Sequence, residues 1–210
     1  MKSKINKTYP RVPYGLSVHD NKEINAVVKV LNTSTQMGKN VALLEKKVAK
    51  LFKKKYGLMV NSGSSANLLG LASFNFKKGS EIITPNLTFS TTIAPIYQLG
   101  LIPHFIGVER NKYLADPSQI ENCINKKTVA IMIPNLLGNI ADWKKIFKIA
   151  KKYKLKVIED SADTIGYTIK GKNTGNYSDV VTNSICRVFN YFKFIFFCNF
   201  KNFFPISYVP

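Results

Sequence analysis

The sequence predicts an α/β fold of three layers, with helices on both faces of a mostly parallel, mixed sheet. From residue 58 onward, short apolar runs alternate with segments whose apolar residues repeat at helical spacing. The runs end at proline, glycine or small polar residues, as expected where a strand ends and a helix begins. The composition agrees, because 45% of the 210 residues are hydrophobic and can form a sizeable core.

The chain divides into an N-terminal arm (1–18), a main α/β body (19–185) and a tail (186–210). Asp20 and Glu23 form a capping-box pattern, which predicts a helix that begins directly after Asp20. Four apolar residues lie at helical spacing in this helix: Ile24, Val27, Val28 and Leu31.

Strands and helices are expected to alternate along the body. The predicted strands cover 58–60, 81–84, 102–108, 129–133, 156–158 and 180–184, and further helices cover 41–52, 88–99, 117–124 and 141–153. We expect Phe147 on the buried face of the last helix and Leu69 on the apolar side of the helix that follows Ser65. Ligands of such sheets bind at the carboxyl ends of the strands. The candidate site therefore lies in the segments that follow four of the strands: Asn61–Ser65, Pro85–Phe89, Pro134–Gly138 and Glu159–Asp163.

The formal charge of +19 comes almost entirely from lysine. A basic chain can bind nucleic acid or an anionic membrane, and a nucleic-acid-binding module is one alternative for the function. The lysines are spread along the predicted helices, which is more typical of solvated helix faces. We therefore expect neither nucleic acid nor a membrane as a partner.

The three cysteines, Cys123, Cys186 and Cys198, have no paired spacing. This argues against a disulfide framework and a metal site, and it is typical of a reducing compartment. The lysine-rich N-terminus is followed by no apolar stretch, so we expect no signal peptide. These observations predict a cytoplasmic protein without a bound metal.

A phosphate site is predicted where the strand at 58–60 turns into a helix. Gly63, Ser64 and Ser65 lie at this turn, and a helical pattern follows at once. The unpaired N–H groups and the dipole of a helix N-terminus attract an anion, and serine hydroxyls can add hydrogen bonds. An ordinary serine N-cap is the alternative explanation of the same residues.

Three more strand ends carry candidate binding residues. Asp160 follows an apolar strand, so its carboxylate needs a cationic or N–H partner, and Asp163 lies three positions further on. Phe89 is placed to stack on a flat ring, and the hydroxyl of Ser184 can reach the same phosphate as Gly63. Glu159 is expected to point to the opposite face and to be structural. Together these residues predict a site for a planar, phosphorylated heteroaromatic cofactor.

Four stretches resemble, in order, the DegT-type sugar aminotransferase family, which consists of vitamin B6 enzymes of fold type I. They are Thr35–Gly38, Asn61–Asn67, Pro85–Thr92 and Val157–Gly166. The resemblance implies the large domain of the aspartate-aminotransferase fold, incomplete at its C-terminus because family members are much longer.

The resemblance also implies roles for the candidate residues. The cofactor would be pyridoxal 5′-phosphate or pyridoxamine 5′-phosphate. The substrate would be a nucleotide sugar used for surface polysaccharide, the amino donor glutamate, and the assembly a homodimer. Gly63, Ser64, Ser65 and Ser184 would bind the phosphate, Phe89 would stack on the ring, Asp160 would hold the ring nitrogen, and Asp163 would lie near the phenolic oxygen.

The stretch Asn135–Asn139 is similar to the 3-dehydrase branch, whereas aminotransferase members have a His-Leu-Tyr-Gly-like sequence there. In the family, a Schiff-base lysine or a replacing histidine lies about five positions after the serine that matches Ser184. Phe189 stands at that position. The catalytic residue is therefore unknown, and a catalytically inactive remnant is a second hypothesis beside the enzyme.

The tail departs from the family pattern. Eight of the fourteen phenylalanines lie between Phe189 and Phe204, and this stretch has neither a clean helical nor a clean strand period. We interpret residues 186–210 as a segment translated out of the ancestral reading frame.

Overall fold

The computed structural model describes residues 20–33, 36, 38–169, 171–184 and 195–198. The predicted arm and most of the tail lie outside these residues. The helices are α1 (Asn21–Leu31), α2 (Lys39–Leu51), α3 (Gly63–Ala72), α4 (Ser90–Gln98), η1 (Pro117–Gln119), α5 (Ile120–Cys123), η2 (Leu136–Gly138) and α6 (Trp143–Tyr153). The strands are β1 (Tyr56–Met59), β2 (Glu81–Pro85), β3 (Ile102–Ile106), β4 (Thr128–Pro134), β5 (Lys156–Asp160), β6 (Thr168–Ile169), β7 (Lys172–Asn173), β8 (Val180–Asn183) and β9 (Ile195–Cys198).

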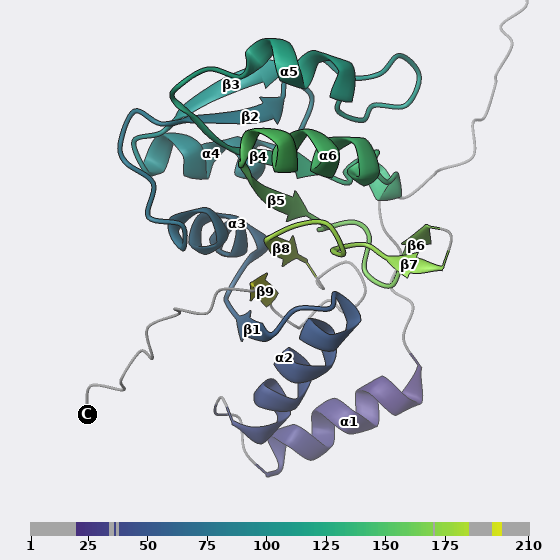
Figure 1. Cartoon of the computed structure of the whole chain (residues 1–210). Helices are drawn as coiled ribbons and strands as arrows, with labels where there is room; N and C mark the ends of the chain where they lie inside the picture. Colours follow the sequence, from purple (N-terminus) through teal and green to yellow (C-terminus); the bar gives the residue numbers. More distant parts are fainter. Residues whose placement is uncertain (1–19, 34–35, 37, 170, 185–194, 199–210) are drawn as a thin grey trace, which may run out of the picture.

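A seven-stranded sheet forms the centre of the molecule, with the order β1-β9-β8-β5-β4-β2-β3 (Figure 1). The pairs β8–β5, β5–β4, β4–β2 and β2–β3 are parallel, whereas β9 runs antiparallel to both of its neighbours. This confirms the prediction of a mostly parallel, mixed sheet. β6 and β7 form a separate two-stranded hairpin.

Helices cover both faces of the sheet, because successive residues of each buried strand point to opposite sides. In β5, Val157 packs in the cluster that contains Trp143 and Ile146 of α6. Its neighbour Ile158 packs in the cluster that contains Ala66 of α3 and Ile96 of α4. α6 therefore covers one face and α3 with α4 the other, which confirms the three-layer prediction.

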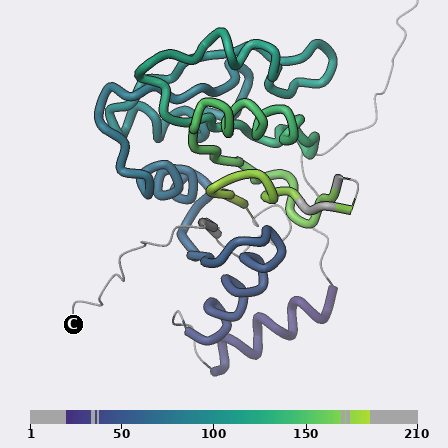
Figure 2. Tube along the Cα trace, viewed as in Figure 1, coloured from purple at the N-terminus to yellow at the C-terminus, as the bar shows by residue number. Residues whose placement is uncertain are grey.

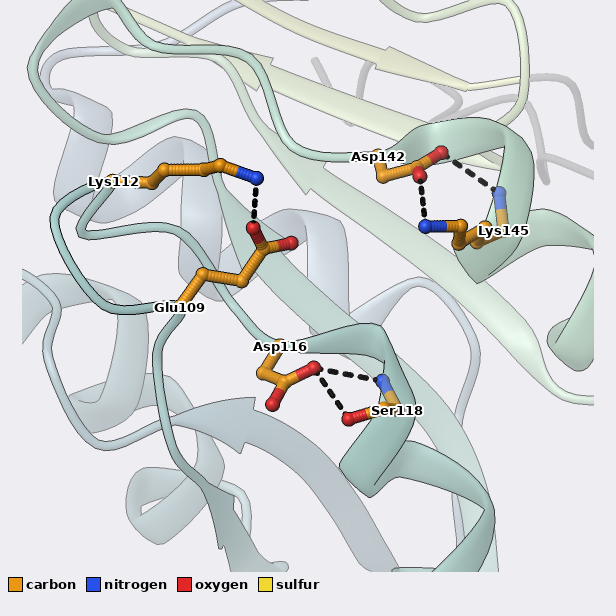
Figure 3. Close-up of polar contacts among 6 residues, drawn as sticks. All are labelled: Glu109, Lys112, Asp116, Ser118, Asp142 and Lys145. Atoms are coloured by element: carbon orange, nitrogen blue, oxygen red, sulfur yellow. Dashed lines mark hydrogen bonds and ion pairs between the residues drawn. The ribbon is translucent and has the colours of Figure 1, made fainter.

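The helix starts follow local sequence signals. Asp20 and Glu23 form the predicted capping box of α1. Asp116 accepts hydrogen bonds from the backbone N–H and hydroxyl of Ser118, and Asp142 caps α6 and pairs with Lys145 (Figure 3). Side chains at these positions replace the backbone acceptors that the first turn of a helix lacks.

The structure corrects three details of the predicted elements. β3 ends at Ile106, before the predicted Val108. Phe147, expected on the buried face of α6, is 39% exposed, and Leu69, expected on the apolar side of α3, is 42% exposed. The buried stripe of α3 is Ala66, Asn67, Gly70 and Leu71, and its apolar members Ala66 and Leu71 pack against residues of the sheet.

β9 contains residues of the tail for which no strand was predicted. It lies between β1 and β8, and each of its four residues pairs with both neighbours. Strands pair through their backbone N–H and C=O groups, which every residue but proline carries in full. A segment without a strand-like side-chain period can therefore still pair as a strand.

Figure 2 shows α1 and α2 at one end of the molecule and the region of β3 and α5 at the opposite end. The sheet extends from its edge strand β1, beside α2, to its other edge strand β3 (Figure 1). Among the described residues, no helix has the length and apolar character needed to cross a bilayer.

Candidate cofactor-binding site

A cavity of about 440 Å³ lies where β4, β5 and β8 end. Its volume is in the range of small-molecule sites, roughly 300–1,000 Å³. Six of the seven predicted binding residues line it: Gly63, Ser64, Phe89, Asp160, Asp163 and Ser184. The structure thus brings together residues that lie more than a hundred positions apart in the chain.

The first turn of α3 forms one wall of the cavity. Ser62 is the N-cap, and its Oγ accepts the N–H of Ser65 at 3.0 Å and donates to the Ser65 hydroxyl at 2.9 Å. Ser65 does not line the cavity, so the structure gives it a capping contact. Gly63 and Ser64 do line it, and the N–H groups of a first helical turn have no partner within their helix.

Asp160 lies at the buried end of β5 and is 6% exposed. Its Oδ2 accepts hydrogen bonds from Asn67 Nδ2 and Thr92 Oγ1, both at 2.9 Å, and its Oδ1 accepts the N–H of Ala162 at 3.2 Å. Burial raises the pKa of this carboxyl, and the three hydrogen bonds oppose that rise. A buried carboxyl of this kind favours a cationic partner from the cavity.

Glu159 points to the opposite face of the sheet, as its neighbouring position in a strand requires. It is fully buried and accepts hydrogen bonds from the Gly175 N–H at 2.8 Å and from Asn135 Nδ2 at 3.0 Å. The Lys54 ammonium donates to the carbonyls of Gly175 and Ser178. This network holds the loop before β8, and Glu159 itself does not line the cavity, so the structural role predicted for Glu159 is confirmed.

Phe89 and Asp163 lie at the mouth of the cavity. Phe89 is the N-cap of α4 and is 66% exposed, which leaves its ring free of the core. Asp163 Oδ2 accepts the N–H of Leu137 at 3.1 Å. Leu137 has φ +55°, a left-handed backbone that costs free energy for a residue with a side chain.

Asn135, the first residue of the dehydrase-like stretch, has a structural role. Its Oδ1 accepts from Trp143 Nε1 at 2.8 Å and from the Ala141 N–H at 3.1 Å. Its Nδ2 donates to Glu159 and to Ser161 Oγ. The side chain therefore ties β4 to α6 and to the turn after β5.

Sequence reasoning missed Asn67, Thr92 and Thr182 as members of the site. All three are buried and line the cavity, and Thr182 Oγ1 donates to Asn67 Oδ1. The sequence holds one signal for Asn67, since it is a polar residue in the buried stripe of α3. No comparable signal marks Thr182, which is one polar residue within a strand.

Two further observations test whether a ligand fits. Thr88 Oγ1 and Asn183 Oδ1 are buried without a hydrogen-bond partner among the described residues, and both residues line the cavity. Buried polar atoms usually have partners, so these atoms favour a polar ligand. No group of three histidine, cysteine or acidic side chains suited to a metal occurs in the described part of the chain.

Ser184 lines the cavity just after β8. Phe189, which stands at the expected place of the catalytic lysine or histidine, lies outside the described residues.

The fold and the cavity together define a class of protein. It is an α/β domain with a buried carboxylate and a helix N-terminus at the carboxyl end of a mixed sheet, with an exposed aromatic ring at the mouth. This arrangement suits a small, flat, anionic ligand with a protonated ring nitrogen.

The chain belongs to the DegT/DnrJ/EryC1/StrS aminotransferase family, which matches residues 17–189. It is 36% identical over 180 residues to a GDP-4-keto-6-deoxy-D-mannose 3-dehydratase of Yersinia pseudotuberculosis, covering 82% of this chain and 46% of that protein. The chain therefore spans about half the length of the curated relatives it matches.

Solved structures show the same likeness. The E. coli GDP-4-keto-6-deoxy-D-mannose-3-dehydratase with bound hydrated PLP superposes with a TM-score of 0.84 at 30% identity, covering 90% of this chain and 51% of that one. Helicobacter pylori PseC, an aminotransferase involved in the biosynthesis of pseudoaminic acid, also gives 0.84, at 26% identity, with 90% and 52% covered. These comparisons confirm the fold type I resemblance of the sequence.

Proposed function

We propose that this chain carries the cofactor site of a pyridoxal phosphate-dependent enzyme of nucleotide-sugar biosynthesis, of the 3-dehydratase type. One observation carries the proposal. The buried Asp160 carboxylate, the N-terminus of α3 and the exposed Phe89 ring line the same cavity. Each of these features suits one part of the cofactor.

The phosphate would bind at the first turn of α3. Gly63 and Ser64 offer N–H groups there, and Ser64 and Ser184 offer hydroxyls. Gly63 has no side chain between its backbone and the cavity. Phe89 would stack on the ring, because an exposed aromatic face gains contact area on a flat ligand.

Asp160 would accept the N–H of the ring nitrogen and keep it protonated. When bound, the cofactor supplies an electron sink for a carbanion, and that ability depends on a protonated ring. A carboxylate shielded from water interacts more strongly with such a cation than an exposed one. Asp163 lines the same cavity and would face the phenolic oxygen.

The substrate class follows from the relatives and from the charge. The Yersinia relative is named for a GDP-activated 4-keto sugar, and the stretch Asn135–Asn139 is similar to the dehydrase branch. The excess of lysine creates a positive field that attracts an anionic nucleotide sugar. We further propose glutamate as the amino donor, a homodimer as the complete assembly and the cytoplasm as its location.

A second candidate function is a cofactor-binding chain without catalysis. Phe89, Asp160 and Gly63 are all present, but Phe189 replaces the residue that would handle protons during the reaction. A phenyl ring has no group that can accept or donate a proton. In this candidate function, the chain binds the cofactor but does not catalyse a reaction.

Titration of the purified chain with pyridoxamine 5′-phosphate, followed by fluorescence, tests the binding proposal. We expect saturable binding that Asp160→Asn weakens roughly 10- to 100-fold, as the loss of a charge-assisted hydrogen bond predicts. Glu109→Gln is the matched control, since it removes the same charge from an exposed turn outside the cavity. Equal affinities of Asp160→Asn and wild type would refute the proposed site.

Borohydride reduction of the chain in the presence of pyridoxal phosphate tests whether a lysine elsewhere in the chain forms the Schiff base in place of the expected residue. If the chain binds without catalysis, mass spectrometry finds no cofactor fixed to a lysine at the site. A single modified lysine, lost in Asp160→Asn, would instead show that another side chain replaces the expected one.

A further inference from the structure

Asn67 lines the cavity, and its side-chain amide makes hydrogen bonds to three other elements of the fold. It lies one turn into α3 and is 3% exposed. Its Nδ2 donates to Asp160 Oδ2 at 2.9 Å and to the carbonyl of Thr91 at 3.1 Å, and its Oδ1 accepts from Thr182 Oγ1. The amide therefore has one orientation that satisfies its neighbours, and it joins α3 to α4, β5 and β8.

Thr92 supplies the second side-chain donor to the same oxygen. It is 1% exposed and donates its hydroxyl to Asp160 Oδ2 at 2.9 Å. Donors from two different helices thus hold one oxygen of the carboxylate. This prevents rotation of the group about its last bond, because rotation would leave buried donors unpaired.

The other oxygen remains available for a ligand. Oδ1 accepts the N–H of Ala162 at 3.2 Å, and each carboxylate oxygen can accept about two hydrogen bonds. Asp160 lines the cavity, so the remaining capacity of Oδ1 is the place for a donor from the ligand.

Asn67 also links the two ends of the site. It lies four residues after Gly63 on the same helix, so it is about one turn from the phosphate-binding end of α3. A rigid helix that touches Asp160 through Asn67 sets the distance between the phosphate position and the carboxylate.

We propose that Asn67 and Thr92 are positioning residues that fix the Asp160 carboxylate toward the ring nitrogen of the cofactor, and that Asn67 sets its distance from the phosphate-binding turn. This inference rests on the proposed function of the cavity. Neither residue needs to touch the cofactor for this role.

The electrostatics of the carboxyl support the same role. Burial and the nearby Asp163 raise the pKa of Asp160, whereas the hydrogen bonds from Asn67, Thr92 and Ala162 lower it. The other side chains that bond to this group are neutral. Loss of either donor would therefore raise the pKa of Asp160 and weaken its hold on a cationic ring.

Two ligands that differ at one atom test the proposal. Pyridoxamine 5′-phosphate and its 1-deaza analogue share the phosphate and the ring, but the analogue has C–H in place of the ring nitrogen. We expect Asn67→Ala and Thr92→Val to weaken binding of the natural ligand about tenfold, the worth of one such hydrogen bond. In the same variants, the affinity for the analogue should fall about twofold or less.

Two controls complete this comparison. Thr92→Ser keeps the hydroxyl and should restore binding, and Ser73→Ala removes a hydroxyl at the far end of α3 and should change neither affinity. Equal losses for the two ligands would overturn the proposal, because they would show a general disturbance of the cavity.

A second measurement needs no cofactor. Carbon-13 NMR of the Asp160 carboxyl, titrated with pH in the ligand-free chain, should give a higher pKa in Asn67→Ala than in wild type. An unchanged pKa would overturn the role of Asn67 at the carboxylate. If the wild-type chain binds neither ligand, the proposed function fails, and this titration alone decides whether Asn67 controls Asp160.

Discussion

α6 and α1 both carry apolar residues at helical spacing, but they bury different amounts of them. In α6, Trp143, Ile146 and Ala150 are buried in the cluster that packs on β4 and β5. No residue of α1 is buried, and Val28 and Leu31 are 48% and 63% exposed. Each helix is capped by an aspartate.

The difference shows that a helix and its burial have separate causes. The caps and the apolar period predict where a helix forms and which stripe it offers. The apolar stripe stabilises the helix only when it packs against another element, since most helical stability in proteins comes from tertiary contacts. α6 has such a packing partner in the sheet.

The largest effect is expected for Trp143→Ala in α6. This change removes a buried aromatic side chain and leaves Asn135 Oδ1 without the Trp143 indole donor, so we expect the free energy of unfolding to fall by about 3–5 kcal/mol. Urea denaturation measures it. Should this variant fail to fold, Ile146→Val provides a milder change of about 0.5–1.5 kcal/mol. A loss below about 1 kcal/mol for Trp143→Ala would contradict the contrast.

The two caps should differ in the kind of stability they provide. Asp142→Ala removes the acceptor of the Lys145 N–H and should lower global stability by about 1 kcal/mol. Asp20→Ala should instead leave global stability nearly unchanged and speed amide hydrogen exchange within α1, because α1 can open without disturbing the core. Equal losses of global stability in the two variants would show that α1 is part of the cooperative unit.

A surface change in α1 should have almost no effect. Leu31→Gln replaces an exposed apolar side chain, and we expect the free energy of unfolding to change by less than about 0.5 kcal/mol. The urea midpoint checks this value. A loss of about 2 kcal/mol would indicate that Leu31 is covered in solution.

The smallest effect is expected at the ion pair between α5 and α6. The Lys152 ammonium donates to Glu121 and holds the pKa of this exposed carboxyl below its usual range. The folded state therefore gains stability above the unfolded pKa, about 4.3, and loses it as pH falls through the lower folded pKa. Glu121→Gln should lower Tm slightly near neutral pH and not at all in strong acid. The same small difference should vanish at about 1 M salt.

The sequence alone determined the fold class and much of the site. Alternating periods predicted the parallel strands, and the segments predicted to follow the strands supply residues that line the cavity: Gly63, Ser64, Phe89, Asp160 and Asp163. These positions follow from local rules, since strand ends of a parallel sheet share one edge. The binding roles predicted for these residues, and for Ser65 and Ser184, remain predictions.

Only the tertiary structure showed which polar side chains form hydrogen bonds with each other. Asn67, Thr92 and Thr182 join Asp160 through contacts between residues 68 to 115 positions apart, which no local pattern encodes. In the same way, the sequence predicted the apolar stripe of α1 but not that this stripe remains exposed. Local propensity depends on neighbours along the chain, whereas burial and hydrogen-bond partners depend on neighbours in space.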